Sequence, residues 1–569
     1  MVPINPYDKL DEAQQERLVA KRKTRRRITA IVLSSIVLVA VVVATVVGVS
    51  KTKNNQSGAA GDPSVWSSMK TMCSVTLYPD SCYNSMAPMV KSNNFKPQDF
   101  FKLSVQVAVD ELAKASTNFT ENVSKKFNIT DNSTLSAIET CEELFSLALD
   151  HLNNSISIQN TNLLEAFNDL RTWLSSAGTY QQTCMDELEN ASNELQIFTN
   201  DNLKNSNEYT SNSLAIVSSF ESIAAMGSIG RRRLMNLDDA PEWVSLGDRR
   251  LLQTKSSSIT PDAVVATDGS GNYKTIKAAL KAVPDKSKKR FVIYVKKGVY
   301  YENVKVEKSK WNVMMFGDGE KATIVSGSLN VIDGTPTFQS ATFAVMGQGF
   351  IARDMGFRNN AGPAKHQAVA LMSTADFSIF YRCTMDAFQD TLYVHSNRQF
   401  YSQCNIYGTV DFIFGNSAVV IQNSNILPKK PMPGQQNTIT AQGRFDPNQN
   451  TGISIQNCNI TPAASLAGVS SYLGRPWKNY STTVYIGNSI GSFIDPKGWL
   501  PWVGTTAPTT IFYAEFQNSG PGAVTKNRVN WKGLKLNLNA AQVKQFTVGP
   551  FINGDKWIPA TGVTYKSGL

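Results

Sequence analysis

The chain contains 569 residues, which exceeds what one hydrophobic core normally holds and predicts two or more domains. Its formal net charge of +11 hides two oppositely charged halves. Residues 62–230 carry 9 basic and 20 acidic side chains, a net −11, whereas residues 253–569 carry 32 basic and 17 acidic, a net +15, so a uniformly basic protein is excluded. Opposite charges favour docking of the first half onto the second, and the basic half alone would attract a polyanion.

A basic tail at residues 1–27 precedes a continuous run of apolar or small residues at 28–49. At about 1.5 Å per residue this run can cross a bilayer of roughly 30 Å. The basic flank predicts a signal anchor with its N-terminus in the cytoplasm, so that the rest of a single-pass type II precursor enters the secretory lumen. A cleaved signal peptide is the alternative, although the run is long and lacks a clear small-x-small cleavage site.

Secretion is also indicated by seven of the chain's Asn-x-Ser/Thr acceptors for N-glycosylation, of which the first four lie close together. These seven are Asn118, Asn122, Asn128, Asn132, Asn190, Asn459 and Asn479. Most of the seven cysteines should pair in an oxidising compartment, and the odd number leaves at least one unpaired. A secreted chain is not expected to meet nucleic acid, so an anionic polysaccharide is the expected partner of the basic half.

Residues 62–220 predict an all-α domain, a bundle of about four helices. Apolar residues recur near the helical period of 3.6 in two proline-free runs. These residues are Leu144, Leu147, Ala148 and Leu152, and then Leu163, Phe167, Leu170, Trp173 and Leu174. The segment also contains Cys73, Cys82, Cys141 and Cys184. Pairing the first with the second and the third with the fourth is one of three connectivities that the sequence allows.

Residues 221–252 are predicted to be a processing linker. Two arginine clusters, 231–233 and 249–250, flank an acidic, proline-containing stretch at the boundary between the charged halves. Secretory processing proteases cleave at such clusters, so we expect cleavage after Arg233 or Arg250 to release the basic half. Dibasic pairs also arise by chance, but their position at the charge boundary supports this interpretation.

A regular interval organises the basic half. A triplet of small, polar and apolar residues recurs at 383–385, 404–406, 424–426 and 458–460, with two nearly equal steps and then a longer one that holds an inserted loop. Short strands are also expected at residues 350–354 and 453–457, and no convincing helical period lies between them. Periods near 20 indicate a solenoid, and because a leucine ladder is absent, a parallel β-helix is favoured over a leucine-rich repeat.

Two aspartates, Asp390 and Asp411, are separated by the same interval as Cys383 and Cys404. If this interval is one coil of the solenoid, each pair is stacked on neighbouring coils at the spacing of adjacent strands, roughly 4.8 Å. Two carboxylates that close cannot comfortably both be charged, so one tends to hold a proton. The stacking also fits the Cα separation of a Cys383–Cys404 disulfide, which would leave Cys458 unpaired.

Five blocks of the basic half resemble, in order, the signature blocks of plant pectin methylesterases. They are residues 298–302 (GVYYE), 367–371 (QAVAL), 389–392 (QDTL), 411–415 (DFIFG) and 473–477 (LGRPW). This resemblance covers about residues 260–565. Segment 62–220, with its four cysteines and the run DLRTWL at 169–174, resembles the invertase and pectin methylesterase inhibitor family. Together they match a precursor type in which an inhibitor-like domain precedes the esterase.

The resemblance implies a right-handed parallel β-helix at 253–569 that hydrolyses the C6 methyl ester of galacturonate in homogalacturonan. The products are methanol and pectate, and no cofactor is implied. The resemblance implies that Asp411 is the nucleophile and that Asp390 acts first as general acid and then as base. Gln389 and Gln367 would donate to the oxyanion. Arg475 would hold Asp411 and contact the substrate, and Trp477 would contact the sugar. The chemistry is consistent, because an ester carbonyl needs a nucleophile, a proton for methoxide and donors for the oxyanion.

Further substrate contacts are less firmly indicated. Thr337 occupies the place of a substrate-contacting threonine in the family, and Phe388, Trp499 and Trp502 could line a sugar cleft. Aromatic rings suit the apolar faces of pyranoses, but they suit a core equally well. The histidines His151, His366 and His395 show no metal-ligand spacing, so no metal is expected.

The sequence thus predicts a secreted cell-wall esterase whose inhibitor-like region restrains or assists it until cleavage. Expected partners are methyl-esterified homogalacturonan, its own or another inhibitor-like domain, a processing protease, and the membrane before processing. A pectate lyase would need a calcium-binding acidic cluster, and a polygalacturonase would need a different carboxylate arrangement, and neither is visible. The other alternative, a catalytically inactive pectin-binding or inhibitor protein, is disfavoured because the Gln-Asp-Asp-Arg set is intact.

Overall fold

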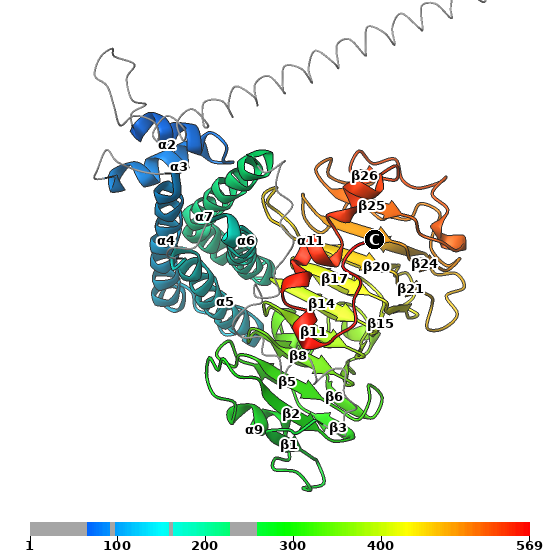
Figure 1. The fold of residues 1–569 in the computed structure, drawn as a ribbon. Helices are drawn as coiled ribbons and strands as arrows, with labels where there is room; N and C mark the ends of the chain where they lie inside the picture. Colours follow the sequence, from blue (N-terminus) through cyan, green and yellow to red (C-terminus); the bar gives the residue numbers. More distant parts are fainter. Residues whose placement is uncertain (1–64, 91–96, 159–162, 228–258) are drawn as a thin grey trace, which may run out of the picture.

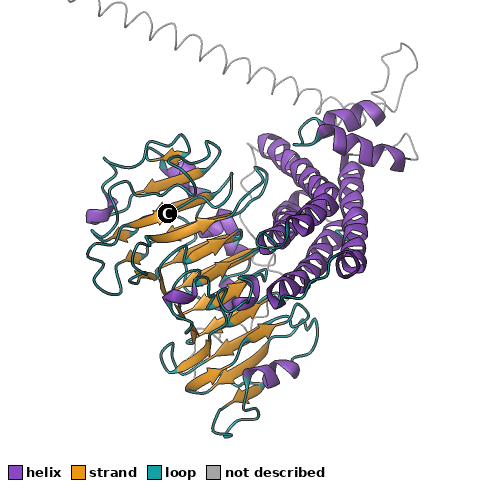
Figure 2. Cartoon of the chain, turned by 180° about the vertical axis from the view of Figure 1, so that it is seen from behind, coloured by secondary structure: helices purple, strands orange, loops and turns teal. Residues whose placement is uncertain are grey.

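The structure is a computed structural model that describes residues 65–90, 97–158, 163–227 and 259–569. The expected N-terminal tail, the membrane span at 28–49 and both arginine clusters lie outside these residues. Within the described ranges, none of the helices combines the length and apolar character needed to cross a membrane. A helical bundle and a β-helix lie side by side (Figures 1 and 2).

The bundle confirms the all-α prediction for the first half. Its elements are α2 (Val65–Cys73), α3 (Pro79–Met86), η1 (Ala87–Met89), α4 (Pro97–Lys126), α5 (Asn132–Ile156), α6 (Leu163–Glu187) and α7 (Asn193–Gly227). The four long helices pack around one core, with α5 against α4 and α6, and α7 against α4 and α6. The first predicted apolar stripe lies in that core, as do Phe167, Leu170 and Leu174 of the second, whereas Trp173 is half-buried and lies outside the buried cluster.

Two disulfides hold the bundle, Cys73–Cys82 and Cys141–Cys184, as the pairing in chain order predicted. The predicted boundary with the linker is wrong, because α7 continues to Gly227 rather than ending at residue 220. Between residues 220 and 227 the sequence contains no proline and no glycine before Gly227, so nothing ends the helix earlier.

The second half is a parallel β-helix in which, between β2 and β24, every third strand joins the same sheet. The 11-stranded sheet contains β1 (Ala263–Val265), β2 (Phe291–Val295), β5 (Val313–Phe316), β8 (Ile351–Arg353), β11 (Ser378–Tyr381), β14 (Arg398–Ser402), β17 (Ala418–Gln422), β20 (Gly452–Gln456), β23 (Thr482–Ile486), β25 (Phe512–Phe516) and β26 (Leu534–Lys535). The 8-stranded sheet contains β3 (Gly298–Tyr301), β6 (Thr323–Gly327), β9 (Gly356–Asn359), β12 (Thr384–Asp386), β15 (Asn405–Gly408), β18 (Asn425–Pro428), β21 (Asn459–Ile460) and β24 (Ser489–Ile490).

The third sheet, which we call the cleft sheet, has seven strands. They are β4 (Val304–Val306), β7 (Phe343–Val345), β10 (Leu371–Ser373), β13 (Leu392–Val394), β16 (Ile413–Gly415), β19 (Asn437–Gln442) and β22 (Ser471–Gly474). Short helices complete the domain: α9 (Ile276–Lys281), η4 (Phe338–Ser340), η5 (Pro363–Lys365), η6 (Pro521–Ala523), α10 (Ala540–Lys544), α11 (Val548–Ile552), η7 (Gly554–Lys556) and η8 (Pro559–Thr561).

The predicted sequence repeat corresponds to the register in which successive coils pair. Thr384 pairs with Asn405, Asn405 with Asn425, and Asn425 with Asn459, so the four triplets lie on successive coils despite the longer last step. Side chains alternate between the coil interior and the outside, because successive residues of a strand point to opposite faces. On β13, Leu392 and Val394 therefore fill the interior, whereas Tyr393 points outward against the bundle.

The predicted Cys383–Cys404 disulfide is wrong. Both residues are buried free thiols, and so is Cys458, for which the sequence offered no partner. Cys383 and Cys404 do lie one coil apart, but their Sγ atoms approach the carbonyl oxygens of Tyr381 and Phe380, at 3.5 and 3.3 Å. The two thiols are close enough for a side-chain contact with Cys404 to add to the effect of burial in raising the pKa of Cys383. Stacking at coil spacing thus brings the thiols together without fixing the specific geometry that a disulfide requires.

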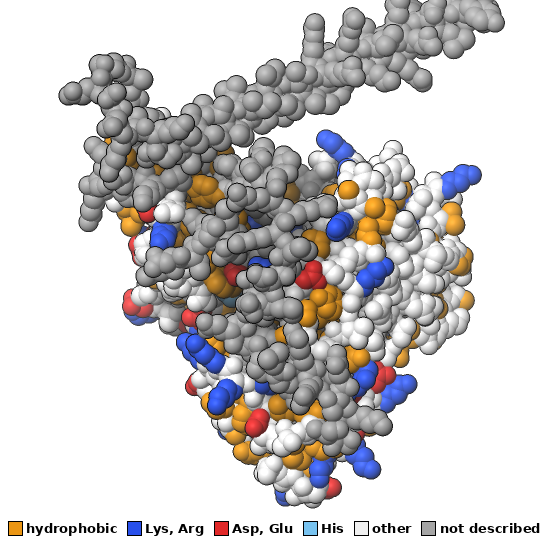
Figure 3. All heavy atoms as spheres, viewed as in Figure 1, with side chains coloured by type: hydrophobic (Ala, Val, Ile, Leu, Met, Phe, Trp, Pro, Cys, Tyr) orange, Lys and Arg blue, Asp and Glu red, His pale blue; other side chains and the backbone are white. Residues whose placement is uncertain are grey.

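Six of the seven expected glycosylation acceptors are exposed, and Asn122 is half-buried. On the face shown in Figure 3, Lys and Arg side chains are spread over the β-helix and outnumber Asp and Glu. The basic excess that the sequence assigns to this half thus reaches its surface.

Candidate active site

The two aspartates lie on neighbouring coils, each two residues before a strand of the cleft sheet. β13 begins at Leu392 and β16 at Ile413, and these two residues pair directly, so Asp390 and Asp411 are stacked as predicted. Both aspartates are buried, at 8% and 5% exposure. Both adopt a left-handed backbone, with φ of 63° and 50°, which Asp tolerates better than most residues.

Arg475 holds Asp411 with both prongs of its guanidinium. It follows β22, the cleft strand two places from β16. Its Nε donates to Asp411 Oδ1 at 2.8 Å and more weakly to Oδ2 at 3.1 Å, and its Nη2 donates to Oδ2 at 2.6 Å. Such forked, charge-assisted hydrogen bonds fix both the position and the negative charge of a carboxylate.

Asp390 is in the opposite electrostatic situation. Burial raises the pKa of its carboxyl group well above the usual value, and the negative charge of Asp411 raises it further, while Arg475 opposes the shift. No described side chain forms a hydrogen bond with its carboxyl oxygens. Asp390 therefore holds a proton beside an ion-paired Asp411, which is the division of roles expected for two stacked carboxylates.

Two glutamines lie directly beside this pair. Gln367 and Gln389 form a parallel β-bridge between neighbouring coils, and both side chains are half-buried. Neither side-chain amide donates a hydrogen bond to another described residue, so both remain free to donate to a bound molecule. Thr337, the expected substrate contact, is half-buried at the start of η4.

Aromatic side chains form one wall of the site. Trp477 lies near Trp502, with ring centroids 6.4 Å apart, and the Arg475 guanidinium lies 4.4 Å from the Trp502 ring centroid. Phe388, next to the glutamine–aspartate pair, is covered by the ammonium group of Lys429 at 3.6 Å. That Trp477, Trp502 and Phe388 border a sugar cleft stays a prediction.

The interpretation of Trp499 as a cleft residue is wrong. Its side chain is fully buried inside the β-helix, where its ring centroid lies 4.4 Å from that of Tyr513. Its indole Nε1 donates to Glu515 at 3.0 Å, and Arg528 neutralises that carboxylate. Trp499 pairs with Gly474 at the end of β22, so it points into the coil, whereas Trp502 three residues later lies outside.

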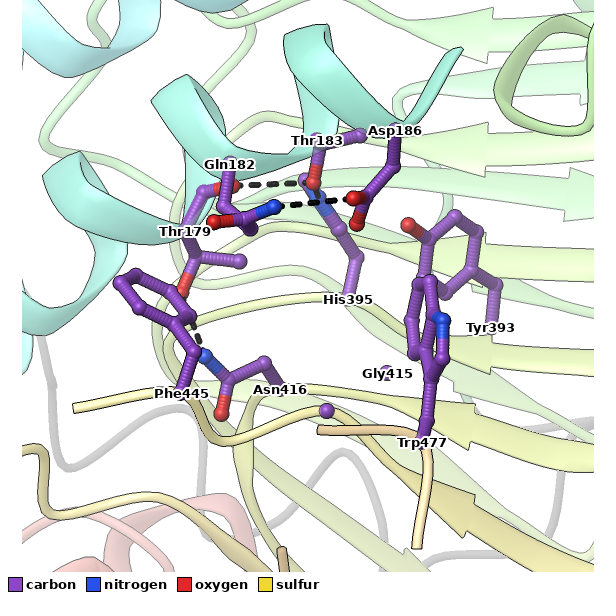
Figure 4. A pocket seen from close by; sticks show the side chains of 11 residues that line it. Thr179, Gln182, Thr183, Asp186, Tyr393, His395, Gly415, Asn416, Phe445 and Trp477 are labelled. Atoms are coloured by element: carbon purple, nitrogen blue, oxygen red, sulfur yellow. Dashed lines mark hydrogen bonds between the residues drawn. The ribbon is translucent and has the colours of Figure 1, made fainter. Parts of the chain in front are cut away.

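The helix α6 of the bundle covers the cleft sheet at this site (Figure 4). A small pocket lies between the two, lined on one side by Thr179, Gln182, Thr183 and Asp186 of α6 and on the other by residues including Tyr393, His395 and Trp477. Thr183 Oγ1 lies 2.8 Å from His395 Nε2. The helix thus packs on the outer face of the cleft sheet and contacts the part of the site that contains Trp477.

The last residue of α6, Glu187, reaches the edge of the site. Its carboxylate accepts a hydrogen bond of 3.1 Å from the backbone N–H of Phe338, next to Thr337. Burial raises the pKa of Glu187 to about 8, and the neighbouring acidic residues add to the shift. Glu187 is close enough to Asp390 to contribute to the raised pKa of that residue.

Among the described residues, four ion pairs join the bundle to the β-helix. Lys308 pairs with Asp150 at 2.6 Å, Arg398 with Asp169 at 2.6 Å, Lys478 with Asp186 at 2.7 Å, and Lys305 with Glu143. In every pair the acid belongs to the bundle and the base to the β-helix. The docking expected from the opposite net charges is therefore built from specific contacts.

The sequence interpretation missed Thr438. Its hydroxyl donates to Asp411 Oδ1 at 2.6 Å and accepts the Asp411 backbone N–H at 2.8 Å. Thr438 follows Asp411 by 27 residues, because this coil contains an insertion, so the regular coil interval does not point to it. In the described part of the chain, no group of three His, Cys, Asp or Glu side chains is arranged to hold a metal ion.

Comparison with known proteins agrees with this geometry. The Pectinesterase family profile matches residues 262–555, and that of the plant invertase/pectin methylesterase inhibitor family matches residues 67–216. The chain is 52% identical over 573 residues to the Arabidopsis thaliana protein "Putative pectinesterase/pectinesterase inhibitor 24", covering 99% of this chain and all of the relative. It is 48% identical over 586 residues to "Pectinesterase 3" of Phaseolus vulgaris, covering 99% and 98%.

A solved structure supports the fold of the second half. The pectin methylesterase from carrot is 53% identical, with a TM-score of 0.55, and the match covers 55% of this chain and 100% of the carrot chain. The esterase half thus corresponds to a chain that exists as a complete structure without the bundle. The chain described here belongs to the pectinesterase family and carries an N-terminal domain of the plant invertase/pectin methylesterase inhibitor family.

Proposed function

We propose that this pectinesterase removes the methyl esters of homogalacturonan through a covalent intermediate on Asp411. The observation that carries the proposal is the asymmetry of the two stacked carboxyl groups. Asp411 is ion-paired with Arg475, whereas Asp390 holds a proton and has no side-chain partner among the described residues. One group is thus equipped as a nucleophile and the other as an acid.

In the first half of the reaction, a carboxylate oxygen of Asp411 attacks the ester carbonyl carbon. The electron pair of the C=O bond moves to oxygen, and the side-chain amides of Gln367 and Gln389 donate to this oxyanion. When the intermediate collapses, the bond to methoxide breaks and Asp390 gives its proton to the departing oxygen. Methanol leaves, and the galacturonate acyl group remains bound to Asp411 as an anhydride.

In the second half, Asp390 acts as a base. Its carboxylate takes a proton from a water molecule, whose oxygen attacks the acyl carbon. The bond to Asp411 then breaks and restores its carboxylate beside Arg475. Asp390 is protonated again, so the enzyme returns to its starting state, and the product carboxyl group loses the second proton of the water to solvent to give pectate. No step needs an additional reactant.

The bundle is proposed to restrain the enzyme until it is released. Support comes from α6, which lies over the cleft face, and from the ion pairs that join it to the β-helix. A polysaccharide chain could not lie along the outer face of the cleft sheet while α6 occupies it. Cleavage after Arg233 or Arg250, secretion to the cell wall through an N-terminal anchor, and glycosylation at the exposed acceptors complete this proposal.

Methanol release from highly methyl-esterified pectin tests both parts. The full chain would be produced with a specific protease site in the 228–258 segment, and activity measured before cleavage, after cleavage, and after separation of the bundle at high salt. We expect activity to increase by at least tenfold on separation. Full activity of the uncleaved chain would refute the restraint but not the esterase.

The same assay on separated Asp411→Asn and Asp390→Asn enzymes tests the catalytic roles. Each substitution is nearly isosteric, and each should reduce kcat by a factor of about 10³ or more, because it removes the nucleophile or the proton donor. Trp477→Phe is a matched control that alters the sugar wall and should mainly raise KM. An Asp411→Asn enzyme with substantial turnover would refute the covalent mechanism.

A further inference from the structure

The backbone amide of Asp411 is satisfied in an unusual way. One coil earlier, the N–H of Asp390 donates to the carbonyl of Val410 at 3.0 Å, the ordinary ladder contact with the next coil. The N–H of Asp411 has a side-chain partner instead, Thr438 Oγ1 at 2.8 Å. The two aspartates have the same left-handed backbone, so the difference lies in what the following coil offers them.

The backbone of Thr438 secures the chain on both sides of Asp411. Its N–H donates to the carbonyl of Thr409 at 3.1 Å, and its carbonyl accepts from the N–H of Phe412 at 3.3 Å. Thr438 itself is 1% exposed, so water does not compete for these contacts. Its hydroxyl is therefore held at a fixed place beside Asp411.

That hydroxyl also donates to Asp411 Oδ1 at 2.6 Å. A hydroxyl group can accept one hydrogen bond and donate another, so one Thr438 side chain closes a ring with the amide and the carboxylate of the same residue. The ring fixes the Asp411 side chain relative to its own backbone. Asp390 has no such ring, which agrees with its role as a group that exchanges a proton.

The two oxygens of Asp411 are consequently not equivalent. Oδ1 accepts from Thr438 at 2.6 Å and from Arg475 Nε at 2.8 Å, which uses the two lone pairs of a carboxylate oxygen. Oδ2 accepts one short bond, from Arg475 Nη2 at 2.6 Å, and shares Nε at the longer distance of 3.1 Å. Only Oδ2 keeps a lone pair that is largely free for attack.

We propose that Thr438 is a positioning residue for the nucleophile, which engages Oδ1 so that Oδ2 attacks the ester carbonyl. The inference rests on the role of Asp411 proposed above. Without the hydroxyl, Asp411 loses one restraint on its side chain and its backbone N–H loses its partner. The carboxylate then spends less time in the orientation for attack, whereas the surfaces that bind the sugar chain are unchanged.

The test compares substitutions of Thr438 in enzyme separated from the cleaved full chain. Thr438→Val keeps the branched shape but removes the hydroxyl, and Thr438→Ser keeps the hydroxyl. We expect Thr438→Val to reduce kcat by about tenfold to a hundredfold with KM within about twofold of wild type, the size of effect that misplacing a reacting group produces. Thr438→Ser should stay within about threefold of wild type in both parameters.

Thr440→Val is the matched control, because it makes the same change two residues along the same strand. The Thr440 hydroxyl donates to the backbone carbonyl of Leu473 at 3.0 Å and not to a carboxylate. It should lower thermal stability with kcat within about twofold of wild type. If Thr438→Val does not fold, Thr438→Ala decides in its place, because it lacks the same hydroxyl and creates no steric conflict.

Wild-type kcat in the variant without the hydroxyl would overturn the inference, and so would a loss confined to KM or an equal kcat loss in Thr440→Val. An inactive wild-type enzyme would instead count against the esterase mechanism. A kcat loss in Thr438→Val that Thr438→Ser restores would support the positioning role, since a merely structural role does not separate kcat from KM.

Discussion

Helices cover the outer faces of two of the three sheets, and the two covers differ in chemistry. On the 11-stranded sheet, α11 and the segment after it bury Val548, Ile552 and the fully enclosed Trp557 in an apolar cluster (Figure 1). On the cleft sheet, the bundle adds four cross-domain ion pairs to its apolar contacts.

The apolar contacts suit a cover that stays in place, and the added ion pairs suit a cover that can be removed. Apolar surface exposed by separation stays unfavourable in water, at about 25 cal/mol per Å². Charged partners regain hydration when they separate, which offsets much of the lost attraction. The C-terminal cover therefore behaves as part of the β-helix core, whereas the charged contacts of the bundle fit the release proposed above.

The largest expected effect is on the permanent cover. Trp557→Ala should destabilise the separated esterase by about 3–5 kcal/mol, because it leaves a cavity in a fully buried cluster. Thermal or urea unfolding measures this change. Trp502→Ala, at an exposed tryptophan of the cleft, is the matched control and should alter KM while changing stability by less than about 1 kcal/mol. Equal destabilisation by the two substitutions would contradict the comparison.

Docking of the bundle should depend on pH through Glu187. Its pKa is about 8 in the docked state against an ordinary value of 4.5, so the docked state keeps a proton that the free bundle releases. The Glu187 contribution to docking is thus greatest below pH 4.5 and is lost as the pH rises through 8. The interface histidines His151 and His395, whose pKa values burial lowers to about 4 and about 3, contribute the opposite slope. We therefore expect the ratio of the wild-type Kd to the Glu187→Gln Kd to increase by about a hundredfold between pH 5 and pH 8, as measured by calorimetry of the separated domains.

Glu187→Gln separates this effect from other titrations at the interface. The variant stays uncharged, so its docking should lose the Glu187 contribution and keep that of the other groups. Asp390 and Asp186, whose pKa values burial also raises, contribute a slope of the same sign as Glu187, whereas His151 and His395 contribute one of the opposite sign. An unchanged slope in the variant would show that Glu187 does not control docking.

A smaller difference between the two covers is expected in how salt affects their binding to the sheets. Raising the ionic strength from about 0.05 to 0.5 M shortens the screening length severalfold and should weaken docking of the bundle by about tenfold. The unfolding temperature of the separated esterase should change little over the same range, because its C-terminal cover is apolar. Docking that strengthens with salt would indicate that apolar contacts dominate at both sheets.

The smallest effect is expected from a single exposed ion pair. Lys308 and Asp150 are 41% and 57% exposed, so Lys308→Ala should weaken docking by less than about 1 kcal/mol, or roughly fivefold in Kd. Lys310→Ala is the matched control, since Lys310 pairs with Asp285 within the β-helix. It should leave the Kd of docking unchanged.

Much of the fold was predictable because the coils repeat. Once Thr384, Asn405 and Asn425 share a register, the stacking of Asp390 on Asp411 follows from equal spacing. The helical bundle also followed from local periodicity, and its two disulfides are one of the three pairings that the sequence left open.

The errors arose where residue spacing alone was used to predict how a side chain points or pairs. Cys383 and Cys404 lie one coil apart and are still free thiols. Trp499 and Trp502 are three residues apart, yet one is fully buried and the other is 38% exposed. Nothing in the residue types distinguishes those outcomes.

The sequence by itself therefore determined the two domains, their opposite charges, the coil register and the pair of stacked aspartates. Only the tertiary structure decided that Thr438 binds Asp411 across an inserted loop and that Glu187 reaches Phe338 from another domain. The physical reason is the distance along the chain over which a sequence pattern determines contacts. A repeat or a helical period fixes which residues are neighbours along its own axis, whereas contacts across an insertion or between domains depend on how the finished surfaces pack.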